Sequence, residues 1–179
     1  MILETNGILD PEQIQSLTVR VRGALLSGEG TKTEILCGAA LAEHNLLGSA
    51  NLTELVDVDL SDVPDKRLAS LASCVTDTLD IRNVTGGQQI ATLLTNLKCY
   101  VLSIIRQNLG QGETLALVQA MESGVEVVVL WDEVTLDMDA LSEYNGQGVC
   151  SAVRLYDDAA AKHKEALRMW ASSWRLESR

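Results

Sequence analysis

The sequence predicts an α/β fold: a solenoid of short strand–helix repeats with a parallel sheet and a helical cap at each end. Three observations predict it. Pairs of apolar residues spaced two apart recur along the chain, a helix-like segment follows each pair, and the steps between pairs are similar. One such unit cannot bury its own apolar face, whereas stacked units bury a continuous core.

Residues 1–50 are predicted to form an N-terminal helical cap. Asp10 and Pro11 begin a helix over residues 10–26, because proline suits the first helical position and acidic residues suit the first turn. A glycine-rich loop then separates this helix from a second one over residues 32–47. Both precede the repeats.

The repeats, with a C-terminal capping helix, are predicted over residues 51–179, and cap and repeats together form a single structural domain. Each repeat opens with a strand whose two apolar anchors face the core and continues into an amphipathic helix. Trp170 and Trp174 share one face of the last helix, which is typical of a lid over the final core layer. The first anchors are Val58, Leu79, Leu102, Val128 and Val153, with steps of 21, 23, 26 and 25, and the helices are residues 66–74, 88–97, 113–121, 136–144 and 157–174.

The segment Leu102 to Met121, LSIIRQNLGQGETLALVQAM, resembles a leucine-rich repeat of the ribonuclease-inhibitor subclass, LxLxxNxLxxxGxxxLxxxL. That subclass also forms the sensor region of many NOD-like receptors. The resemblance covers about residues 50–175 and implies a horseshoe with a parallel sheet on the concave side, helices on the convex side, and protein binding. An asparagine links successive turns in that family. Here two valines hold its position and two asparagines fall one residue away: Val63, Val84, Asn83 and Asn108.

Residues between and just beyond the anchors are predicted to line the concave face in rows. An apolar and aromatic centre with charged flanks is typical of a protein-binding surface. Residues 127–131 are apolar throughout, so a shift by one residue would bury Val129 and Trp131 instead, and the register there stays open. The predicted partner-binding residues are Asp59, Asp80, Arg82, Ile105, Trp131, Arg154 and Tyr156.

Composition argues against several classes of function. With 14 basic and 25 acidic residues the net charge is −11, which disfavours binding to nucleic acid. The chain has neither an apolar run long enough to span a bilayer nor a signal-type N-terminus, so we expect no membrane association and a cytoplasmic location. The four cysteines lack metal-site spacing and are expected to be free, buried thiols.

Catalytic and metal-binding patterns are weak, so we expect no enzyme activity, no cofactor and no metal. Thr31 breaks the Gly-Lys adjacency that a phosphate loop requires. His44 and His163 lie among polar residues without a nucleophile at motif spacing. The acidic residues at 132–139 lack the glycine and closing glutamate of a calcium loop, and Thr135 and Asp137 are better explained as the start of a helix.

These observations predict a non-enzymatic module that binds another protein through its concave face, and the resemblance places it in an innate-immune or signalling receptor. A homo-oligomer is compatible with the sequence. One alternative is a compact doubly wound α/β domain, acting as a small enzyme or a ligand-binding signalling domain, with its ligand near Gly110 or Asp132. Another is that the repeats are a fragment of a longer receptor.

Overall fold

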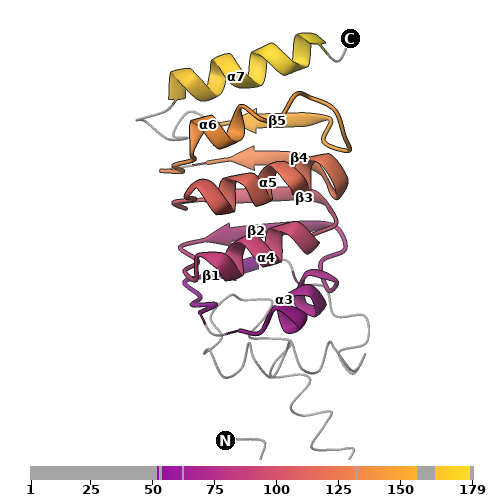
Figure 1. Cartoon of the computed structure of the whole chain (residues 1–179), viewed down its shortest axis with the longest axis vertical. Helices are drawn as coiled ribbons and strands as arrows, with labels where there is room; N and C mark the ends of the chain where they lie inside the picture. The colour runs from indigo at the N-terminus through magenta and orange to yellow at the C-terminus, as the bar shows by residue number, and fades with distance from the viewer. Residues whose placement is uncertain (1–51, 53, 62, 132, 157–163, 178–179) are drawn as a thin grey trace, which may run out of the picture.

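The computed structural model describes residue 52 and residues 54–61, 63–131, 133–156 and 164–177 (Figure 1). The two helices predicted within residues 1–50 lie outside this part of the chain. Strands and helices alternate as predicted. In chain order they are β1 (Glu54–Val56), α3 (Asp65–Ala72), β2 (Thr78–Arg82), α4 (Gln88–Asn96), β3 (Cys99–Ile105), α5 (Gln111–Ser123), β4 (Val125–Leu130), α6 (Met138–Leu141), β5 (Ala152–Leu155) and α7 (Lys164–Glu177).

The described strands form one open parallel sheet of five strands in the order β1-β2-β3-β4-β5, which confirms the predicted parallel sheet. Right-handed crossovers place successive helices on one face when the strands are added in a single direction. Figure 1 shows α3, α4, α5 and α6 on the same side of the sheet. A doubly wound sheet reverses its strand order to cover both faces, and the described strands contain no reversal.

The hydrophobic core lies between the sheet and these helices. Residues two apart in a strand point to the same face, so aligned strands place their apolar residues in rows. Nearly all of these side chains are buried, and Leu155 packs against the same core. The rows are Leu79, Leu102, Val128 and Val153, and Leu55, Ile81, Ile104, Leu130 and Leu155.

The predicted anchors of the first repeat are wrong. The sheet pairs Leu55 with Ile81, so the strand precedes the predicted anchors Val58 and Leu60. These two residues lie in the loop after β1 and are buried in the core. Because they are two positions apart, they have the same spacing as the core-facing residues of a strand. The aligned residues are therefore 26, 23, 26 and 25 apart, closer to a constant period than the sequence alone indicated.

A turn residue in the left-handed region follows each of β1 to β4: Asp57 at φ 53°, Asn83 at 50°, Arg106 at 46° and Glu133 at 49°. Side chains also link neighbouring turns. Asn83 Nδ2 donates to Asp57 Oδ1 over 2.8 Å, and Thr135 donates to Asn108 Oδ1 over 2.7 Å. The chain therefore leaves successive strands through similar turns that are bonded to one another.

Gln107 connects two repeats inside the core. Its Nε2 donates to the Val84 carbonyl over 2.7 Å, and its Oε1 accepts from the Val84 amide over 2.9 Å. The side chain is only 3% exposed. The resemblance to leucine-rich repeats implies an asparagine in this role, whereas the structure has a glutamine one residue before Asn108.

Helix α7 packs against β5 at the C-terminal end of the described chain. Leu167 and Ala171 are buried, and the Trp170 ring tilts against Tyr144 with centroids 6.2 Å apart. The side chain of Trp174 lies outside the described part. No helix among the described residues is long and apolar enough to cross a membrane.

Candidate functional site

The face of the sheet opposite the described helices carries the side chains that alternate with the core rows, and we call it the open face. Its register continues past the strand ends, because the Trp131 amide donates to the Ile104 carbonyl and the Tyr156 amide donates to the Leu130 carbonyl. Beside a row of Thr78, Val101, Val127 and Ala152, two adjacent rows of this face carry its charged and aromatic side chains: Glu54, Asp80, Ser103, Val129 and Arg154, and Val56, Arg82, Ile105, Trp131 and Tyr156.

An aromatic stack forms one end of the second row. The rings of Trp131 and Tyr156 lie 3.7 Å apart between centroids and are inclined by only 5°. Tyr156 is 43% exposed, and Trp131 and the neighbouring Ile105 are partly exposed. The two rings and Ile105 give this face a partly exposed apolar strip, which is the type of surface that protein partners contact.

Two hydrogen-bond donors on the same row lack an acceptor. Arg82 Nε and Trp131 Nε1 are both buried, and neither has a hydrogen-bond partner in the part of the chain that the structure describes. Buried polar atoms in folded proteins nearly always have partners, because an unmade hydrogen bond leaves the desolvation cost uncompensated. These two atoms therefore mark the row as a place where an acceptor would be stabilising.

Six of the seven predicted partner-binding residues lie in these two rows, and Asp59 does not. Asp59 forms an isolated bridge with Thr85 beyond the end of β1. Its Oδ1 accepts from the Ser61 amide at 2.9 Å and from the Thr85 hydroxyl at 3.2 Å, so it holds a turn. The residue paired with Asp80 is Glu54, which sequence analysis missed because it placed the first strand too late.

Of the two registers left open for β4, the structure has the one in which Val128 and Leu130 face the core: both belong to the core cluster and are each 1% exposed, whereas Val127 and Val129 are not part of that cluster. The middle of the open face is more buried than predicted. Ser103 is 5% exposed and Val129 is 7% exposed, although both lie on this face. Both belong to strands flanked on two sides, where neighbouring side chains stand close enough to cover one another.

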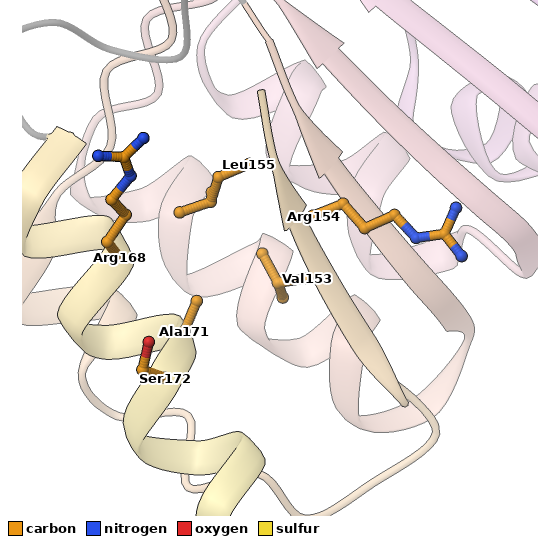
Figure 2. Close-up of a pocket in the computed structure, with 6 residues that line it drawn as sticks. All are labelled: Val153, Arg154, Leu155, Arg168, Ala171 and Ser172. Carbon is orange, nitrogen blue, oxygen red and sulfur yellow. The ribbon is translucent and has the colours of Figure 1, made fainter. Parts of the chain in front are cut away.

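Two arginines lie on the open face. Residues 52–156 contain four arginines, and Arg82 and Arg154 are two of them. A third, Arg106, lies in the turn after β3. Figure 2 shows the exposed Arg154 pointing away from α7, whereas Val153 and Leu155 point toward it. The acidic side chains of the same face, Glu54 and Asp80, lie together on β1 and β2.

A hollow of about 450 Å³ lies between β5 and α7 (Figure 2). Its lining is half apolar and half polar, with Val153, Leu155 and Ala171 on the one hand and Arg154, Arg168 and Ser172 on the other. A second hollow, of about 350 Å³, adjoins the turns after β2 and β3. The Glu113 carboxylate lies beside Gly87 and Gly110 there, so the start of α4 faces a negative charge rather than an anion-binding space.

The titratable groups with clearly perturbed pKa values lie in the core. Burial, and secondarily Asp77, raises the pKa of the Cys99 thiol to about 12. Burial, then Cys150 and Glu122, raises the pKa of Tyr144 to about 12. Among the described cysteines, Cys74, Cys99 and Cys150 are free, as predicted. Raised values make the thiol and the phenol less reactive at neutral pH.

The predicted acidic group begins a helix, as expected. Asp137 is the N-cap of α6, and its Oδ1 accepts from the Ala140 amide at 2.9 Å. Thr135 instead bonds to Asn108, and Asp132 lies outside the described residues. The described ranges contain no group of three or more His, Cys, Asp or Glu residues arranged to hold a metal ion.

Comparisons with models of protein families, with curated proteins and with solved structures found no match to this chain.

Proposed function

We propose that this protein is a non-enzymatic protein-binding module, with a leucine-rich-repeat-like solenoid as its scaffold and the open face as its concave binding surface. One observation carries the proposal. The row Arg82, Ile105, Trp131 and Tyr156 combines a stacked aromatic pair, a partly exposed aliphatic residue and two donors without acceptors. Large aromatic residues and arginine are the residue types that dominate binding energy at protein interfaces.

Regular spacing supports the solenoid part of the proposal. Strands are added in chain order, aligned residues are 23 to 26 apart, and similar turns leave β1 to β4. Residues 1–50 and helix α7 would cap the two ends. Stacked units of this kind present one continuous sheet surface, on which side chains from several strands contact one partner.

The location of the perturbed groups supports a non-enzymatic role. Active sites commonly place groups with shifted pKa values in a cleft, whereas Cys99 and Tyr144 are buried in the core. We propose a cytoplasmic location within an innate-immune or signalling receptor, following the resemblance to leucine-rich repeats. Another protein is the expected partner, and a second copy of this chain is one outcome of the test.

The experiment compares wild type with Trp131→Asp and Arg82→Glu in affinity capture from cell extract, with circular dichroism to show that each variant folds. The control is Met169→Asp, which makes the same change in charge as Trp131→Asp at a side chain that is 67% exposed on α7. We expect a partner that wild type and the control retain and that both open-face variants lose. Folded open-face variants that keep the partner would place the binding surface elsewhere.

A further inference from the structure

We propose that the open face binds an extended acidic segment of the partner, with Arg82 and Arg154 pairing with its carboxylates on either side of an apolar contact to Ile105 and Trp131. The proposal rests on the proposed function and adds the chemistry of the partner.

Charge is the first support. The chain has a net charge of −11, yet two of the four arginines between residues 52 and 156 lie on this face. Within the described ranges, neither Arg82 nor Arg154 has an ion-pair partner. A guanidinium group binds a carboxylate through two parallel hydrogen bonds, which gives geometry as well as strength. Positive groups without partners on an acidic protein are complementary to an acidic ligand.

The atoms without partners are the second support. Arg82 Nε and Trp131 Nε1 are both donors, so the occupant must supply acceptors, which carboxylates and backbone carbonyls do. Both atoms are already shielded from water in the free protein. A small side-chain rotation toward an acceptor, common when interfaces form, therefore gains a hydrogen bond without a further desolvation cost for the donor.

Strand spacing sets the size of the segment. Arg82 is on β2 and Arg154 on β5, three strands apart, so their backbones are about 15 Å apart at roughly 4.8 Å per strand. An extended chain advances about 3.3 Å per residue, so acidic residues about four or five positions apart would reach both arginines. Aliphatic or aromatic residues between them would contact Ile105 and Trp131, and Tyr156 lies beside Arg154 at the end of β5.

The acidic side chains of the face set the direction. Glu54 and Asp80 lie on β1 and β2, at the opposite end from the aromatic stack. They would repel carboxylates, so the segment crosses from Arg82 toward β5. A nucleic acid also carries anionic oxygens, but its continuous charge is repelled by the net charge of −11, whereas a short peptide has only a few charges.

The test selects peptides from a random library displayed on phage against the full chain, then measures labelled synthetic peptides by fluorescence anisotropy. We expect Asp or Glu on both sides of apolar residues. Arg82→Gln and the exposed-site variant Arg154→Gln should each weaken binding about tenfold or more. Lys98→Gln removes the same charge outside the face and should change affinity less than about twofold. Asp80→Asn removes a repulsion and should tighten binding a few-fold.

The outcomes separate this proposal from the proposed function. Selected peptides without excess Asp and Glu that still lose binding to Trp131→Asp would overturn the acidic occupant alone. Acidic peptides that bind every open-face variant as tightly as wild type would contradict both proposals. A labelled single-stranded oligonucleotide that binds more tightly than the selected peptides, and that loses affinity in the arginine variants, would overturn the peptide in favour of nucleic acid.

Discussion

Gln107 shows how one side chain can join two repeats. It bonds to both the amide and the carbonyl of Val84, so a single amide group satisfies two buried backbone atoms. The neighbouring Asn108 is exposed and accepts a bond from the Thr135 hydroxyl. The side-chain amides of Gln107 and Asn108 are therefore expected to contribute differently to stability. Only the loss of Gln107 leaves buried backbone groups without hydrogen-bond partners.

We predict that Gln107→Leu lowers the free energy of unfolding by about 2–4 kcal/mol, since the Val84 amide and carbonyl would be left buried without partners. Asn108→Ala is the matched control and should cost about 1 kcal/mol or less. Urea denaturation followed by circular dichroism measures both. Equal losses in the two variants would contradict the importance assigned to the Val84 contact.

Tyr144 and Cys99 predict a loss of stability in alkaline solution. The pKa of each is raised to about 12 in the folded protein, so the unfolded chain releases these protons at lower pH, from about pH 9 for the thiol and about pH 10 for the phenol. The stabilisation is complete below those values and is lost as the pH rises toward 12.

We predict that Tyr144→Phe makes this alkaline decline shallower. It should also cost about 1 kcal/mol at neutral pH, because the Tyr144 hydroxyl donates to the Cys150 carbonyl at 3.1 Å. Urea midpoints measured with a thiol reductant from pH 7 to pH 11 test this. Tyr100→Phe, at a ring that is 51% exposed, is the control and should match wild type. A Tyr144→Phe curve parallel to wild type would show that this phenol does not contribute to the decline.

At the residue scale, the sequence could place six of the seven predicted residues on the open face, because strand alternation decides which side chains share a face. It could not identify Gln107. Nothing in the local pattern distinguishes a glutamine that turns into the core from one in solvent, and the distinction depends on Val84, in the preceding repeat. Glu54 was missed for a related reason, because the first strand is short and an apolar loop follows it.

Among the elements, helix α5 and strand β4 meet at a glycine that no other residue can replace without movement. A Cβ on Gly124 would collide with the carbonyl oxygen of Leu97. The Gly124 carbonyl also accepts from the Cys99 amide, which fixes the start of β3 against the start of β4. A Cβ on Gly112, inside α5, would meet no other atom within 4 Å. The same substitution should therefore have opposite effects at these two glycines.

We predict that Gly112→Ala stabilises the protein by about 0.5–1 kcal/mol, because alanine favours the helical conformation. Gly124→Ala should destabilise it by about 2 kcal/mol or more, because the backbone must move to relieve the collision. Thermal unfolding of the two variants beside wild type tests the pair. Stabilisation by both substitutions would mean that β3 and β4 separate easily at this point.

The elements themselves were well predicted from the sequence. Helical spacing identified α4 and α5 to within a few residues, and two-residue spacing identified β2 to β5, because these signals are local. The burial of Ser103 and Val129 on the open face was not predicted, since it depends on neighbours contributed by adjacent strands. The predicted position of the first strand was wrong because Val58 and Leu60 are buried in the core but lie outside any strand.

At the scale of the whole molecule, the order of the strands determines which elements are held by neighbours on both sides. Strands β2, β3 and β4 are each paired on both sides, whereas β1 and β5 each pair with one described strand. Likewise α4 packs against α3 and α5. Contacts between neighbours in the chain sequence therefore dominate, and local opening at one end breaks few contacts at the other.

We predict that amide hydrogen exchange is slowest in β3 and its neighbours and faster toward β1 and β5. The reason is that an end strand can detach while the central strands keep their partners. Exchange measured by mass spectrometry at several low denaturant concentrations would show the gradient. Identical opening free energies for β1, β3 and β5 would contradict it and indicate a single cooperative unit.

The stacked rings of Trp131 and Tyr156 also give the open face an optical signal. Two aromatic rings held nearly parallel in a chiral setting produce a circular dichroism band in the near ultraviolet. This band depends on the relative position of the ends of β4 and β5. Ligands that contact the stack would change it without any label, and the Tyr156→Leu difference spectrum would assign it to this pair rather than to the tryptophans of α7.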